Sequence, residues 1–107
     1  MRSKWFAMQA LADTAEISIF DEIGAWGITV ADFKDAFDLV RDKKAITVYI
    51  NSPGGDVTTG MALYNLLAHE RSKITVEVLG IAASIASVVA LAGKELVMDE
   101  GSYYMIH

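Results

Sequence analysis

Three strand-like runs separated by helix-like segments constrain the fold of this chain more than any other feature. Residues 15–20 alternate polar and apolar side chains, as a half-buried strand does; residues 45–50 are a β-branched and aromatic run, and residues 74–79 are strand-like. The run at 45–50 is nearly continuous, which is typical of a strand buried on both faces. Helices between strands predict an α/β fold: a mostly parallel sheet with right-handed crossovers, built from repeated β-α units and covered on both faces by helices.

The helix after the first strand has the clearest pattern. Val30, Phe33, Phe37 and Val40 follow one another at spacings that place them on one helical face, and Thr29 is positioned to cap the first turn. A second helix is expected at about residues 57–70, with Met61, Tyr64, Leu67 and Ala68 at helical spacing, and a third at 84–92. Short strands at 94–98 and 103–107 complete the order β-α-β-α-β-α-β-β.

The first residues do not share this organisation. Residues 1–14 show no clean period and are predicted to be an N-terminal segment that is flexible or belongs to an interface. Residues 15–107 are predicted to form the α/β domain. Trp26, in a turn at 24–27, is interpreted as an anchor in the core or at an interface.

Composition excludes several classes of protein. A chain of 107 residues with 53% hydrophobic residues is one ordered domain at most. A net charge of −5 without a basic stripe argues against a nucleic-acid partner. The absence of cysteine excludes disulfides, thiolate metal sites and a cysteine nucleophile, and the Asp and His residues show no metal-ligand spacing, so no metal or cofactor is expected. The charge-free run at 78–93 is too short to span a bilayer, so a cytoplasmic protein without a membrane partner is expected.

Two strand-to-helix junctions carry the candidate chemistry. Residues 80–87 (GIAASIAS) follow a strand, so Ser84 would lie at the first turn of a helix, where free N–H groups and the helix dipole favour an oxyanion. Residues 51–55 (NSPGG) follow the neighbouring strand, and in parallel sheets ligands bind beyond the C-terminal ends of strands. Both junctions could present N–H groups to one spot. A purely structural interpretation is also open for each junction: residues 80–87 could simply begin a buried Ala/Ser-rich helix, and the double glycine at 54–55 could form an ordinary tight turn.

These motifs together resemble one family. Residues 49–55 (YINSPGG), Gly60, Tyr64, residues 80–84 (GIAAS) and residues 105–107 (MIH) are similar to the Clp protease proteolytic subunit family, serine peptidases of the ClpP/crotonase fold. Residues 20–27 (FDEIGAWG) resemble the branch found in tailed phages and prophages, whose members are head maturation proteases. The resemblance covers about residues 15–107.

The resemblance implies a role for each matching position. Ser84 would be the nucleophile and His107 the general base, while the backbone N–H groups of Gly55 and Ile85 would form the oxyanion hole. The family usually has Met where this chain has Ile85, which supplies the same backbone donor. Ser87, one turn deeper, is expected to face the core.

The same resemblance implies the setting of the activity. A polypeptide substrate, a homo-oligomeric ring, and phage capsid or scaffold proteins as partners are expected. His107 is the last residue, whereas the family's orienting acid and its ring-docking element come later, so the sequence is expected to be a fragment of a longer protein. Four carboxylates are available in this chain, Asp13, Asp21, Asp56 and Asp99. The sequence does not place any of them beside His107, so none is assigned the role of the orienting acid.

Two other functions remain open at this point. One is a truncated, non-catalytic prophage remnant or assembly piece that keeps the fold without a working triad. The other is a crotonase-like acyl-CoA enzyme, which uses a similar pair of backbone N–H groups on a thioester but usually has glycines where this chain has Ala83 and Ser84.

Overall fold

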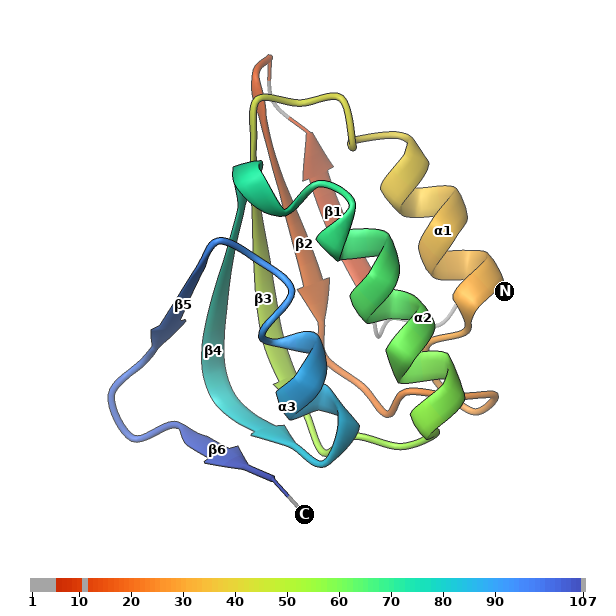
Figure 1. Ribbon diagram of the computed structural model, residues 1–107, viewed down its shortest axis with the longest axis vertical. Helices are drawn as coiled ribbons and strands as arrows, with labels where there is room; N and C mark the ends of the chain where they lie inside the picture. The colour runs from red at the N-terminus through yellow and green to blue at the C-terminus, as the bar shows by residue number, and fades with distance from the viewer. Residues whose placement is uncertain (1–5, 11, 107) are drawn as a thin grey trace.

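The computed structural model describes residues 6–10 and 12–106, which form a six-stranded sheet flanked by helices (Figure 1). The strands are β1 (Phe6–Ala10), β2 (Thr14–Ile19), β3 (Ala45–Ser52), β4 (Ile74–Ala83), β5 (Glu95–Met98) and β6 (Tyr103–Met105). The helices are α1 (Val30–Asp38), α2 (Val57–Ala68), a short 3₁₀ helix η1 (Arg71–Lys73) and α3 (Ile85–Val89). The predicted order of strands and helices from residue 15 onward is confirmed, with η1 added.

The sheet is mostly parallel, as predicted. The strand order is β1-β2-β3-β4-β5. Strands β2, β3, β4 and β5 run parallel to one another, and β1 is antiparallel to β2. Beyond the stretch that pairs with β5, β4 continues and pairs in parallel with β6. The C-terminal end of β4 therefore lies between β3 and β6.

The prediction that helices cover both faces of the sheet is wrong. Figure 1 shows α1, α2 and α3 on the same side of the sheet. In β3, Ile46, Val48 and Ile50 are fully buried against the helices, whereas Thr47 and Tyr49 on the other face remain partly exposed. A β-branched run reports strand propensity, and Thr47 and Tyr49 have high strand propensity without needing burial.

Helix α1 forms as its spacing predicts. The Thr29 hydroxyl accepts a hydrogen bond from the Asp32 N–H at 3.2 Å and caps the first turn. Phe33, Phe37 and Val40 are fully buried against the sheet, and the two phenylalanine rings stack at a centroid distance of 5.8 Å. This apolar face holds α1 on the core.

The segments around the GIAAS motif differ in length from their predictions. β4 does not stop at Leu79 but continues to Ala83, and α3 is only five residues long, Ile85–Val89. Alanine favours helix, but hydrogen bonds to β3 and β6 on either side hold this stretch extended, and tertiary pairing overrides the local preference.

The N-terminal part of the chain contains a strand that the sequence did not predict. Phe6–Ala10 forms β1, in register with β2 from Phe6 opposite Ile19 to Ala10 opposite Ala15. Its sequence, FAMQA, has no alternating pattern, so the partner strand defines it. Residues 1–5 lie outside the described residues, and the division of the chain at 14/15 stays a prediction.

Two apolar residues lie elsewhere than expected. Trp26 is 93% exposed, so its interpretation as a core anchor is wrong, and the interface role stays a prediction. On α2 the buried residues are Gly60, Leu63 and Leu67, while Met61 is exposed.

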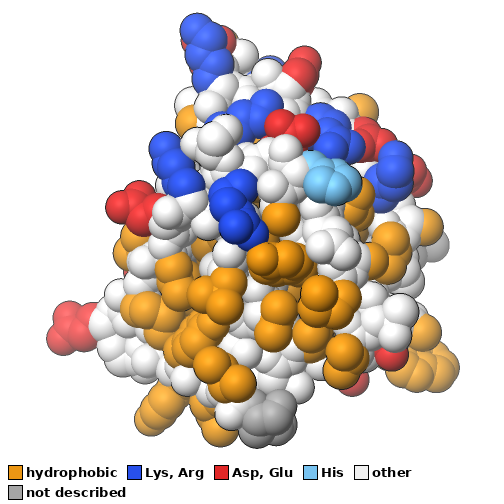
Figure 2. Space-filling model, in the orientation of Figure 1, with side chains coloured by type: hydrophobic (Ala, Val, Ile, Leu, Met, Phe, Trp, Pro, Cys, Tyr) orange, Lys and Arg blue, Asp and Glu red, His pale blue; other side chains and the backbone are white. Residues whose placement is uncertain are grey.

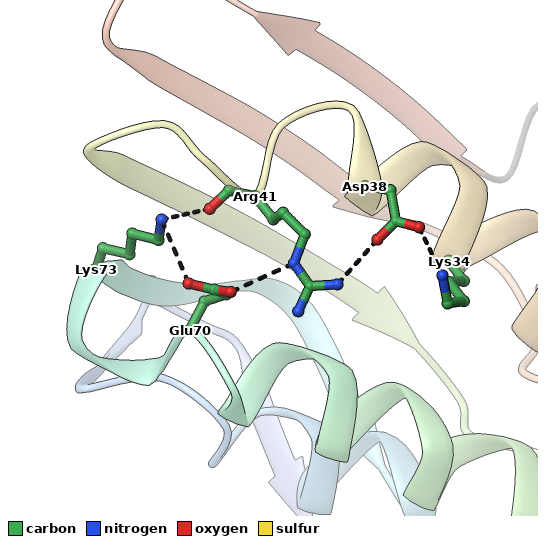
Figure 3. A network of polar contacts seen from close by, with 5 residues as sticks. All are labelled: Lys34, Asp38, Arg41, Glu70 and Lys73. Atoms are coloured by element: carbon green, nitrogen blue, oxygen red, sulfur yellow. Dashed lines mark hydrogen bonds and ion pairs between the residues drawn. The ribbon is translucent and has the colours of Figure 1, made fainter.

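A polar network joins the helices at the end of the molecule away from the C-terminal end of β4 (Figure 3). Arg41 donates to Asp38 at 2.9 Å and to Glu70 at 3.3 Å, which links the end of α1 to the turn after α2. Lys34 extends the network at Asp38, and Lys73 extends it at Glu70 and at the Arg41 carbonyl.

No helix in the described part of the chain has the length and apolarity needed to cross a bilayer.

Candidate active site

Ser84 joins β4 to α3 in an unusual backbone conformation. Its φ of 56° and ψ of −129° make it the one non-glycine residue with positive φ in the described part of the chain. Such a conformation costs about 1–3 kcal/mol and persists where surrounding contacts hold it. Here the Ser84 N–H donates to the Met105 carbonyl at 2.9 Å, and the Ser84 carbonyl accepts from the N–H and the hydroxyl of Ser87.

The Ser84 side chain is not used in capping. Its hydroxyl makes no capping hydrogen bond to α3, and the residue is partly exposed. Ser87, by contrast, is fully buried, as predicted, and its carbonyl accepts from the Tyr104 hydroxyl at 2.6 Å. Burial raises the pKa of the Tyr104 hydroxyl that donates this bond. Of these two serines, only Ser84 has a hydroxyl that bonds to no other residue among those the structure describes.

The glycine pair packs directly against the Ser84 turn. A Cβ added to Gly54 would lie 2.6 Å from the Ala83 carbonyl oxygen, 2.8 Å from the Ser84 Cβ and 3.3 Å from the Ile85 nitrogen. A Cβ on Gly55 would lie 2.0 Å from the Ile23 carbonyl oxygen. Both residues also have positive φ, 101° and 146°. Only glycine fits at either position, and the close approach brings the two predicted junctions together.

Two backbone donors remain free at this contact. Within the described residues, neither the Gly55 N–H nor the Ile85 N–H donates a hydrogen bond. Ile85 is the first residue of α3, where an N–H has no partner within the helix. Two free N–H groups beside a serine hydroxyl can stabilise the oxyanion that forms when the serine attacks a carbonyl.

Asn51 and Ser52 support this loop, and sequence reasoning gave them no role. The register of β3 with β4 shifts between Ile50 and Ser52, and there the Asn51 side-chain oxygen accepts the Ile81 N–H at 3.1 Å. The Ser52 hydroxyl donates to the Asp21 carbonyl at 2.8 Å and accepts the Gly54 N–H at 3.2 Å. The sequence feature that could have indicated this supporting role is a pair of polar residues, Asn51 and Ser52, between a strand and a glycine pair.

His107 lies outside the described residues. The chain leading to it is described to Ile106, and β6 pairs with β4 so that Met105 lies opposite Ala83. The Ser84 N–H bonds to Met105 itself. The structure thus brings the segment two residues before His107 into contact with the serine, and the placement of His107 stays a prediction.

The nearby carboxylates have other partners. Asp21 accepts the Glu22 N–H at 2.7 Å. Asp56 accepts the hydroxyl and the N–H of Thr59, which together lower its pKa as it caps α2. Within residues 6–10 and 12–106, no three His, Cys, Asp or Glu side chains lie together as metal ligands would.

Comparison with known proteins identifies the family of the chain. Residues 5–107 match the Clp protease family. The chain belongs to this family. Over 63 residues it is 46% identical to the ATP-dependent Clp protease proteolytic subunit of Ligilactobacillus salivarius (strain UCC118), which covers 59% of this chain and 30% of that protein.

Solved structures show the same fold. ClpP1 from Listeria monocytogenes superposes with a TM-score of 0.64 at 25% identity, over 73% of this chain and 46% of that one. A membrane-bound stomatin-specific protease, 1510-N, has a TM-score of 0.68 at 19% identity, over 79% of this chain and 42% of the other. The ClpP-like fold is confirmed, and the chain spans less than half the length of each of these relatives.

Proposed function

We propose that this chain carries a serine endopeptidase site in which Ser84 attacks the peptide carbonyl. The Gly55 and Ile85 N–H groups hold the resulting oxyanion, and His107 takes the Ser84 proton and later gives it to the leaving amine. The observation that supports this proposal is the contact of Gly54 with the strained Ser84 turn, beside which the Gly55 and Ile85 N–H groups donate to no described residue. Each such donor is worth about 2.7–4 kcal/mol in related hydrolases.

The role of His107 is supported by the chain before it. Met105 accepts the Ser84 N–H at 2.9 Å, and only Ile106 separates Met105 from His107 in sequence. None of the carboxylates considered above is assigned to orient the histidine. In triad enzymes a missing orienting acid lowers kcat about 10⁴-fold, so a reactive-probe assay is a better first test than peptide turnover.

The test is labelling with a fluorophosphonate, followed by intact mass and peptide mapping. We expect one adduct on Ser84 in the parent chain and none in Ser84→Ala. Ser18→Ala is the matched control, because Ser18 is a partly exposed serine on the helix-free face of the sheet and should leave labelling unchanged. A Ser84→Ala chain labelled like the parent, or an unlabelled parent, would overturn the proposal.

We propose a homo-oligomeric ring as the working assembly. Figure 2 shows apolar side chains gathered over the lower half of the visible face, away from the charged groups at the other end. Three large apolar residues in and just after β6, which pairs with the C-terminal end of β4, are exposed: Tyr103, Met105 and Ile106. Surfaces of this kind usually mark interfaces. Sedimentation analysis should show an oligomer, and a monomer at micromolar concentration would contradict the ring.

The biological setting that we propose is phage head maturation. Its support is the resemblance of residues 20–27 to the head maturation branch, and it implies a polypeptide substrate among phage capsid or scaffold proteins in the cytoplasm of the infected cell. Incubation with a phage major capsid protein should yield a defined cleavage product that Ser84→Ala does not produce. An intact capsid protein after labelling has proved Ser84 reactive would remove this setting and leave the peptidase.

A further inference from the structure

We propose that Ser52 is a positioning residue, which fixes the direction in which the Gly55 N–H points. This inference deepens the proposed function and rests on it for the role of that N–H. Ser52 is one of two fully buried polar residues among those described, and both hydrogen bonds of its hydroxyl are to backbone atoms. Its hydroxyl bridges two backbone segments far apart in sequence, the Asp21 carbonyl and the Gly54 N–H.

The direction of the Gly55 N–H follows from the bonds made by Gly54. The Gly54 carbonyl accepts the Ile23 N–H at 2.9 Å, and no peptide bond in the described residues is cis. In a planar trans peptide the carbonyl and the next N–H point in opposite directions. The Gly55 N–H therefore points away from Ile23, which leaves it free for a ligand.

A glycine pair needs such restraint. Without a Cβ, Gly54 and Gly55 have access to far more backbone conformations than other residues, so the peptide between them could rotate and turn the N–H inward. Ser52 holds the N–H of Gly54, while Ile23 holds its carbonyl, so both polar groups of Gly54 are fixed. Asp56 closes the other side, donating its N–H to the Ile23 carbonyl at 2.8 Å. Of these restraints, only the Ser52 bond comes from a side chain.

The test compares Ser52→Ala with Ile46→Val in the full chain. Ile46 lies at the other end of β3 and is fully buried, so its truncation costs stability on the scale of one lost hydrogen bond without touching the loop. We expect Ser52→Ala to slow fluorophosphonate labelling of Ser84 by about tenfold or more, since removal of a whole oxyanion donor costs about 10²–10³-fold. Ile46→Val should label like the parent. Ser52→Cys, which keeps a weaker donor and acceptor, should fall between parent and alanine variant, and it replaces Ser52→Ala if that variant does not fold.

A second measurement is independent of reactivity. Amide hydrogen exchange at Gly54, followed by NMR, should be at least about tenfold faster in Ser52→Ala than in Ile46→Val, since a broken amide hydrogen bond exposes its N–H to exchange. Normal Ser84 labelling in Ser52→Ala would overturn the positioning role and leave the peptidase proposal standing. An unlabelled parent would overturn the peptidase proposal instead, and the exchange rate would then decide whether Ser52 restrains the glycine loop. An unchanged exchange rate overturns that restraint.

Discussion

Gly60 offers the sharpest test of how the helices hold the candidate site. This α2 glycine is buried, and an added Cβ would lie 2.2 Å from Cγ1 of Ile85 and 3.0 Å from its Cγ2. Ile85 itself is 6% exposed and is the residue whose N–H is a proposed oxyanion donor. Gly60→Ala must therefore displace Ile85, and with it the start of α3.

The magnitude follows from two opposing terms. Alanine in place of glycine within a helix gains about 1 kcal/mol, and overpacking a core contact costs about 1–3 kcal/mol. We expect Gly60→Ala to lower the free energy of unfolding by up to about 2 kcal/mol and to slow fluorophosphonate labelling of Ser84. In an Ile85→Ala background both Cγ atoms are absent, so there Gly60→Ala should recover its helix gain of about 1 kcal/mol.

Urea unfolding of the parent, both single variants and the double variant measures this coupling. Asn65→Ala is the control, because Asn65 is exposed on the same helix and its replacement gains helix propensity without a clash. The claim is that the missing side chain of Gly60 leaves the space that Ile85 occupies. Additive changes in the free energy of unfolding for Gly60→Ala and Ile85→Ala, with labelling of Ser84 unchanged in Gly60→Ala, would refute it.

Three further predictions concern the rest of the fold. Thr29→Ala removes the cap of α1 and should cost about 0.5–2 kcal/mol in urea unfolding, with Thr29→Ser retaining most of it; equal losses would contradict the cap. A hydrogen bond to Asp99 raises the pKa of Glu77 above 4.5, so the folded chain binds the proton more tightly than the unfolded chain. The stability that Glu77 contributes is therefore present below pH 4.5 and is lost as pH rises through the folded pKa. We expect the urea midpoint of the parent minus that of Glu77→Gln to fall over this pH window. A difference that does not change with pH would contradict the shifted pKa of Glu77. Arg41→Gln should cost at most about 1 kcal/mol at low salt and less at high salt, because its ion pair with Glu70 is partly exposed; a loss that is independent of salt would point to packing instead.

The elements that the sequence predicted well are those whose own residues determine them. Phe33 and Phe37 define α1 because helical spacing and full burial agree at both positions, and the partly buried Val30 and the buried Val40 lie on the same apolar side. The same holds for the strand at 15–20, where alternation matches the buried face of β2. In these segments local pattern and tertiary packing favour the same structure, so a single sequence is enough.

The elements that it missed are determined by their neighbours. β1 has no period and is defined by pairing with β2, and residues 80–83 are extended because β3 and β6 flank them. The bare face of the sheet was missed because a β-branched run reports strand propensity rather than burial. No propensity predicts φ of 56° at Ser84, since that conformation is imposed from outside the residue.

The candidate site depends on backbone contacts between three segments that are distant in sequence. The loop at 51–55 meets the Ser84–Ile85 turn through the bare backbone of Gly54, and β6 meets the same turn through the hydrogen bond from the Ser84 N–H to Met105. The side chains in these contacts are small because larger ones would separate the segments, which explains why glycine, alanine and serine dominate both motifs. The strained Ser84 turn and two N–H groups that donate to no described residue thus lie at one junction, where α3 begins at Ile85 and the Ile23 N–H holds the Gly54 carbonyl.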